Sequence, residues 1–159
     1  MHPSDTDTLP CPLCEGRRPR CHLCDGSGTV TPALERIYSA ERLARVLAPE
    51  WRGADDRQRP GVATFSLATY YRRRRFLRGK VVAARGRPVH DGAFGIVELL
   101  DKDGRPLITL HGLAWGYVGE GPAGLANVLA DALPHFFPTT DDARQFVLSL
   151  PQNNLWRVP

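Results

Sequence analysis

The amino-acid sequence predicts an α+β protein, with an N-terminal four-cysteine finger and a helix, then a small antiparallel sheet with two helices on one face. Three observations support this prediction. All four cysteines lie within residues 11–24, short β-branched and aromatic segments follow one another over residues 62–112, and apolar residues recur at helical spacing after residue 120. Strands followed by helices are typical of the α+β class.

The length of 159 residues allows one hydrophobic core and an appendage. We expect a finger over residues 1–30, a helix over 31–48, a linker over 49–61 and an α+β domain over 62–159. Hydrophobic residues make up 42% of the chain and charged residues 24%, which excludes a disordered or collagen-like protein. The N-terminal residues have neither a basic nor an apolar region, so we expect no export signal, a reducing cytoplasmic location and no membrane partner.

The cysteines form two C-x2-C pairs, Cys11-Pro-Leu-Cys14 and Cys21-His-Leu-Cys24. Two such turns supply four thiolates to a tetrahedral site, so the spacing predicts one structural Zn²⁺ with no open position for catalysis. Gly16 and Gly26, each preceded by an acid, are expected to adopt the left-handed conformation that turns backbone N–H groups toward the sulfurs. The alternatives are disulfides, which a reducing compartment disfavours, and a redox pair, which needs a preceding strand and a following helix.

Residues 11–16 and 21–28 resemble the CxxCxGxG repeats of the DnaJ-type cysteine-rich zinc finger. That family has four repeats and two zinc ions, and the two repeats of this chain imply one. Arg18 stands where the first repeat would have its second glycine, and the J-domain is absent from this sequence. The resemblance implies the metal and its four ligands. Single-zinc relatives of this finger serve as protein-binding or nucleic-acid-mimicking modules.

A helix is expected after the finger, with Thr31 as its N-cap and Pro32 as its first residue. Its apolar positions have helical spacing up to Pro49, and they are Leu34, Ile37, Ala40, Ala44 and Leu47. The polar segment PEWRGADDRQRPG then predicts the linker.

Four strands are expected, over residues 62–71, 80–84, 93–100 and 105–112. Asp101–Gly104 is expected to form a hairpin turn between the last two. One helix is predicted up to Pro134 from the spacing of Leu125, Val128, Leu129, Ala132 and Leu133. Another is predicted to begin at a Thr140 cap, to bury four apolar residues and to end at Pro151, those residues being Ala143, Phe146, Val147 and Leu150.

Residues from about 70 to 158 resemble a family of small bacterial, archaeal and phage-associated domains of unknown function. The shared features are the tract WGYVGEGPAGLA over residues 115–126 and a later helix that ends near Trp156. Residues 119–124 within this tract match G-x-G-x-x-G, a pattern of phosphate-binding loops. Glu120 would repel a phosphate and Pro122 lacks an N–H donor, so we expect a structural turn with Trp115 and Tyr117 packed beneath it.

Positive charge is concentrated in residues 61–90, which contain eight basic and no acidic side chains. If this segment were a strand, Arg72 and Arg74 would share one face, and Arg73 and Arg75 the other. We expect a non-catalytic module that binds nucleic acid through arginines, with neighbouring aromatic rings stacking on bases. The expected binding residues are Arg72, Arg73, Arg74, Arg75, Arg78 and Lys80, with Arg17, Arg18 and Arg20 of the finger as an auxiliary surface.

Two alternatives remain for the arginine cluster. An acidic protein surface is one, which would make the protein an adaptor or regulatory subunit that uses the finger and exposed aromatic residues. The other is an edge strand whose charges only maintain solubility. An enzyme is not expected, because no motif places a nucleophile beside a base, and His111 is expected to be a hydrogen-bonded residue near a sheet end.

Overall fold

The structure is a computed structural model, and it describes residues 8–47, 56–89 and 94–159. The predicted α+β class is confirmed. The described helices are α1 (Pro32–Leu47), the 3-10 helix η2 (Asp56–Gln58), α2 (Ala63–Leu77), α3 (Glu120–Ala132) and α4 (Thr140–Ser149). The described strands are β1 (Leu9–Pro10), β2 (Thr29–Val30), β3 (Ala83–Pro88), β4 (Gly95–Leu100), β5 (Pro106–Leu113) and β6 (Trp156–Val158).

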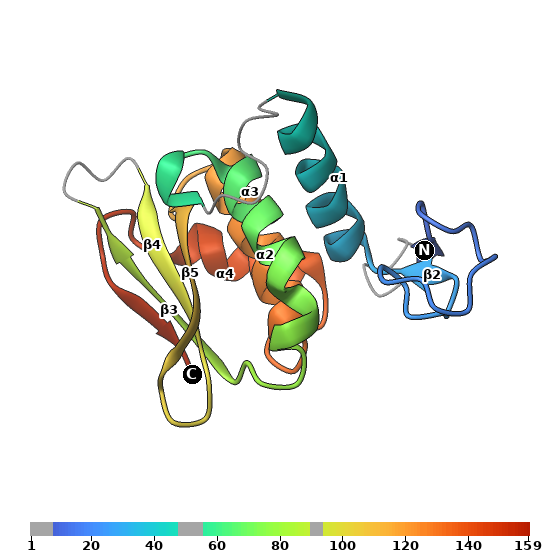
Figure 1. Cartoon of the computed structure of the whole chain (residues 1–159). Coiled ribbons are helices and arrows are strands. Elements are labelled where there is room, and N and C mark those ends of the chain that lie inside the picture. The colour runs from blue at the N-terminus through green and yellow to red at the C-terminus, as the bar shows by residue number, and fades with distance from the viewer. Residues whose placement is uncertain (1–7, 48–55, 90–93) are drawn as a thin grey trace.

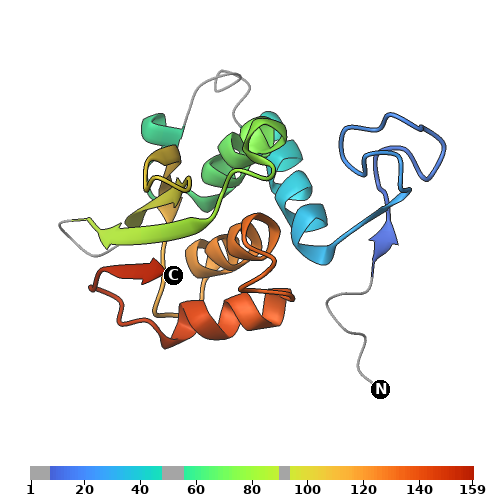
Figure 2. The same ribbon diagram turned by 90° about the horizontal axis from the view of Figure 1, so that it is seen from below.

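The main sheet is antiparallel with the strand order β5-β4-β3-β6, so the C-terminal strand forms one edge. The larger helices lie on one side of this sheet, and the finger lies beyond them, on the side away from the strands (Figure 1). Figure 2 shows the same arrangement from below. The core between sheet and helices includes Leu99, Leu110, Leu125 and Leu129, all fully buried. β1 and β2 pair with each other and close the finger.

The predicted strand over residues 62–71 is wrong, because this segment is the first part of helix α2. Ala63, Leu67 and Tyr70 recur at helical spacing and enter the main core. On another side of the helix, Phe65 and Ala68 pack against Ala44 of α1. Burial on two sides makes the apolar run almost continuous, which removes the periodicity that distinguishes a helix from a strand.

The other predicted strands and both later helices are present with shifted ends. Gly104 has φ +79° in the hairpin turn between β4 and β5, as expected, and Asp101 accepts hydrogen bonds there from the backbone N–H groups of Asp103 and Arg105. The N-cap of α4 is Thr139 rather than the predicted Thr140. It forms a capping box with Asp142.

The glycine tract over residues 119–124 is the N-cap and the first residues of α3 rather than a separate turn. A Cβ atom on Gly121 would lie 2.9 Å from the Cβ of Ala114, and one on Gly124 would lie 3.1 Å from Leu113. These two glycines therefore let the helix approach the end of β5 closely. Tyr117 lies beside Gly119 and Gly121 of the tract, as expected, whereas Trp115 is buried against Trp156 and Gly95.

Helix α1 starts as predicted, because the Thr31 hydroxyl accepts a hydrogen bond from the Leu34 N–H at 3.2 Å. Residues 48–55, which include most of the predicted linker, lie outside the described part of the chain. The next residues, Asp56–Gln58, form η2, and Asp56 is fully buried against the main domain.

Candidate metal centre and arginine surface

The four cysteine sulfurs lie together and are buried, with all four Sγ atoms within 4.8 Å of one another. The Cys11 and Cys21 sulfurs are 3.8 Å apart, and those of Cys14 and Cys24 are 3.5 Å apart. A tetrahedral zinc site with Zn–S bonds of about 2.3 Å requires sulfurs about 3.8 Å apart. None of the four forms a disulfide. This arrangement fits a single metal ion held by four thiolates.

The two C-x2-C turns have the same local structure, ten residues apart. In the first, the Glu15 N–H donates to the Cys11 carbonyl at 3.0 Å, and in the second the Asp25 N–H donates to the Cys21 carbonyl at 2.8 Å. Gly16 and Gly26 have φ values of +82° and +85°, as predicted from the sequence, and the acids before them are also left-handed. The chain therefore folds back after each pair and directs both sulfurs of the pair to one point.

Backbone donors and burial act in opposite directions on the thiols. Burial raises the pKa of Cys11 to about 11. Burial also acts to raise the pKa of Cys14, but the backbone N–H groups of Arg18 and Gly16 outweigh it and lower the pKa to about 6. The Gly28 N–H donates to the Cys24 sulfur at 3.3 Å. The pocket thus stabilises thiolate at some positions, and a metal ion that binds all four sulfurs displaces the remaining protons.

The finger is packed against the helices. The rings of His22 and Tyr38 both lie near Tyr71, with ring centroids 6.2 Å and 5.6 Å from it. Asp25, directly after the last cysteine, forms an ion pair with Arg78 just beyond the end of α2. The second C-x2-C turn and the residue after it thus make both contacts between the cysteine cluster and the region of α2.

The predicted strand geometry of the arginine run is wrong, because Arg72 to Arg75 lie on α2. Successive side chains on a helix are about 100° apart, so the run faces several directions. Three of the six predicted binding residues form intramolecular ion pairs. Arg72 lies 3.6 Å from the buried Glu41 of α1, Arg74 binds Asp131 of α3, and Arg78 binds Asp25.

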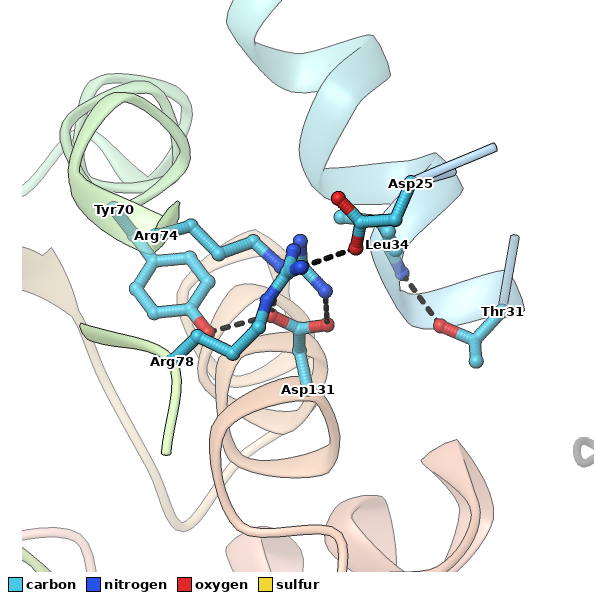
Figure 3. A network of polar contacts seen from close by, with 7 residues as sticks. All are labelled: Asp25, Thr31, Leu34, Tyr70, Arg74, Arg78 and Asp131. Carbon is cyan, nitrogen blue, oxygen red and sulfur yellow. Dashed lines mark hydrogen bonds and ion pairs between the residues drawn. The ribbon is translucent and has the colours of Figure 1, made fainter. Parts of the chain in front are cut away.

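Figure 3 shows the network around Asp131. The Arg74 guanidinium forms two hydrogen bonds with this carboxylate, of 2.6 Å and 3.0 Å, and the Tyr70 hydroxyl donates to it at 2.5 Å. Burial, together with the Asp131 charge, raises the pKa of Tyr70 well above its usual range. The network joins α2 to α3, and the neighbouring Arg78–Asp25 pair joins α2 to the finger.

The other basic residues of the run are exposed. Arg73, Arg75 and Lys80 form no ion pair with any residue that the structure describes. Phe76 is also exposed, at 66%, and it neighbours Arg73 on the helix surface at i and i+3. We name these four exposed residues, which lie on more than one side of α2 or just after its end, the α2 surface. The finger's arginines are exposed as well, and Arg17 lies 3.9 Å from Glu15.

A polar cluster that the sequence does not indicate surrounds Asp56. This carboxylate is fully buried, and it accepts hydrogen bonds from the Ser66 hydroxyl at 2.5 Å and the His111 backbone N–H at 2.6 Å. Its other oxygen lies 3.0 Å from Nδ1 of His111. His111 is a hydrogen-bonded residue on the sheet, as expected. No pattern in the polar segment before α2 distinguishes Asp56 from its exposed neighbours.

Comparison with family models, curated proteins and solved structures gives no match for this chain. Among the described helices, none has the length and apolar character needed to cross a membrane. The fold and the cysteine cluster together define the class of protein: an α+β domain to which a segment with four clustered cysteines, able to hold a metal ion, is attached.

Proposed function

We propose that this protein is a non-catalytic zinc-binding module that binds nucleic acid through the α2 surface. Zinc is the metal that best suits four thiolates in a closed tetrahedral arrangement. In this proposal the ion is structural and is held by a DnaJ-like finger, and it keeps that finger folded against α2. The arginines of the loop between the two cysteine pairs, Arg17, Arg18 and Arg20, offset the formal charge of −2 on a four-thiolate zinc site and extend the basic surface.

The observation that supports nucleic acid most directly is the exposure of Phe76, which follows Arg75 and lies three residues after Arg73, two arginines that have no ion pairs among the described residues. Guanidinium groups bind phosphates through paired hydrogen bonds, and an aromatic ring stacks on an unpaired base. The ion pairs of Arg72, Arg74 and Arg78 favour a folding role for those three residues. The proposed binding set is therefore the α2 surface and the finger arginines.

Fluorescence anisotropy with mixed-sequence single- and double-stranded oligonucleotides at two salt concentrations tests this proposal. We expect binding that weakens with salt, with a logarithmic slope of about −0.7 per neutralised phosphate on single strands and about −0.9 on duplex. The double variant Arg73→Glu/Arg75→Glu should abolish binding and change the unfolding free energy by less than about 0.5 kcal/mol. Lysine at both positions should weaken binding only in part, because lysine keeps the positive charge but lacks the planar guanidinium that forms paired hydrogen bonds.

The matched control is Arg87→Glu/Arg105→Glu, which changes the charge by the same amount at one exposed residue of β3 and one exposed residue of the turn between β4 and β5. It should retain most of the affinity. Full binding by the Arg73→Glu/Arg75→Glu variant, or equal losses in both double variants, would show that the α2 surface is not the binding site.

A protein adaptor is the second candidate function. Leu43, Val46 and Leu47 are exposed on α1 by 49%, 75% and 67%, and their i, i+3, i+4 spacing places them together on the helix. Adjacent exposed apolar residues favour a protein partner. If neither oligonucleotide binds at low salt, the adaptor becomes the better proposal.

A further inference from the structure

An open cavity of about 370 Å³ lies beside β5, between this strand, η2 and α2. Its polar lining comes from Arg57 of η2, Thr69 and Arg73 of α2, and Thr109 and His111 of β5. We propose that this cavity binds a phosphate group, held by the ring of His111 and the guanidinium groups of Arg57 and Arg73. The phosphate could belong to a nucleic-acid strand or to a small phosphorylated ligand. The first source rests on the proposed function, and the second is independent of it.

The buried Asp56 determines which atom of His111 is available to a ligand. An ionised carboxylate only accepts hydrogen bonds, so the Nδ1 atom, 3.0 Å from Asp56 Oδ1, carries the hydrogen of this pair. The Asp56 carboxylate is itself held by Ser66 and by the His111 backbone. The Nε2 atom has no hydrogen-bond partner within the described residues, and the side chain is 20% exposed. Nε2 is therefore the ring atom that a ligand in the cavity meets.

A phosphate oxygen next to Nε2 accepts a hydrogen bond when both ring nitrogens of His111 carry a hydrogen. In that imidazolium form Nδ1 donates to Asp56 and Nε2 donates to the ligand. The Asp56 carboxylate next to Nδ1 balances the charge of the imidazolium, so no isolated positive charge is buried. The Asp56–His111 pair is thus oriented to hold a donor toward the cavity.

The two arginines give the cavity its preference for phosphate. Arg73 is exposed and has no ion pair with a described residue, and the lining contains no carboxylate. Two guanidinium groups and an imidazolium surround a single space, which matches a tetrahedral anion with several acceptor oxygens better than a planar carboxylate. The Thr69 hydroxyl is not a donor to the ligand, because it donates to the Phe65 carbonyl at 2.9 Å.

Nitrogen-15 NMR of the metal-loaded full chain tests the site with inorganic phosphate as the probe and chloride at equal ionic strength as the reference. We expect saturable shifts of the His111 ring signals with phosphate, and no comparable shifts for His22 and His135, which lie outside this cavity. Arg73→Gln should weaken phosphate binding by about tenfold, the effect of losing one charge-assisted contact. The control Arg87→Gln removes an exposed arginine on β3 and should bind as the wild type does.

A mononucleotide and a mixed-sequence oligonucleotide, added in separate titrations, identify the source of the phosphate. Shifts of His111 with both phosphate and the oligonucleotide support a subsite for the nucleic-acid backbone. Shifts with phosphate and the mononucleotide, but no oligonucleotide binding, support a site for a small phosphorylated ligand and contradict the proposed function. Oligonucleotide binding without any His111 shift overturns the phosphate site and leaves the proposed function intact, and an unresponsive His111 in all titrations overturns the site outright.

Discussion

Three buried acids, Glu41, Asp56 and Asp131, each meet a partner from another element of the structure. Glu41 lies near Arg72, Asp56 binds His111, and Asp131 binds Arg74. Burial of a carboxylate costs free energy unless the carboxylate is paired. The observed packing of the helices therefore requires these contacts. These partners are tens of residues away in the chain, and Glu41 has a local partner as well, Arg45 at i+4 and 2.7 Å.

Removal of the Asp131 carboxylate should destabilise the protein strongly. Asp131→Ala leaves the Arg74 guanidinium, whose side chain is 19% exposed, without its partner. The expected loss is about 3 kcal/mol of unfolding free energy, as for other broken buried pairs. Urea denaturation measures it. Arg144→Ala, which breaks an exposed pair with Asp141, should cost less than about 1 kcal/mol, and equal losses in the two variants would contradict the role of Asp131.

Tyr71 should make stability depend on pH in the alkaline range. Burial raises the pKa of Tyr71 to about 12, above the usual value of about 10. Its neutral form is therefore favoured by folding, and this contribution is complete below pH 10 and lost as pH rises through 12. Its hydroxyl has no hydrogen-bond partner in the described residues, so Tyr71→Phe should be nearly neutral at pH 8.

Denaturation of wild type and Tyr71→Phe at pH 8, 10 and 11.5 measures this effect. The wild type should lose more stability than the variant between pH 10 and 11.5. Parallel losses in the two proteins would show that the Tyr71 hydroxyl does not contribute.

At the scale of single elements, local sequence patterns were sufficient to predict the type of a helix or strand wherever one of its sides is exposed. They predicted α1 with its Thr31 cap, both later helices and the hairpin at Gly104. They failed for α2, whose first half is buried on two sides. The cysteine cluster was predictable because all its ligands lie within residues 11–24, whereas the division of the arginine run into paired and exposed residues depends on tertiary contacts.

The start of α2 crosses β5 at Gly112, and a larger residue there should separate the two. A Cβ atom at this position would lie 2.4 Å from the Val62 carbonyl oxygen and 2.7 Å from the Ser66 hydroxyl. Gly112→Ala should therefore cost about 1–3 kcal/mol of unfolding free energy and disturb the Ser66–Asp56 hydrogen bond. Thermal and urea denaturation measure the loss, and a variant as stable as the wild type would refute this close approach.

At the scale of the whole molecule, the finger has little core of its own. Its buried cluster consists of the cysteines and a few apolar residues, namely Leu23, Val30, Leu34 and Tyr38. In the proposed function, the binding energy of a structural zinc ion, of the order of 10–16 kcal/mol in isolated fingers, folds this segment. Chelation should unfold residues 9–30 and break their contacts with Tyr71 and Arg78, while the sheet and its helices remain folded. Loss of amide signals confined to the finger would show this, and an unchanged NMR spectrum after chelation would contradict it.

The central claim is that Cys11, Cys14, Cys21 and Cys24 together hold one structural zinc ion. Elemental analysis of the purified protein tests it most directly, with the double variant Cys11→Ser/Cys24→Ser beside it. We predict one zinc per chain in the wild type and almost none in the variant. A wild-type content well below one zinc per chain, or an equal content in the variant, would contradict the claim.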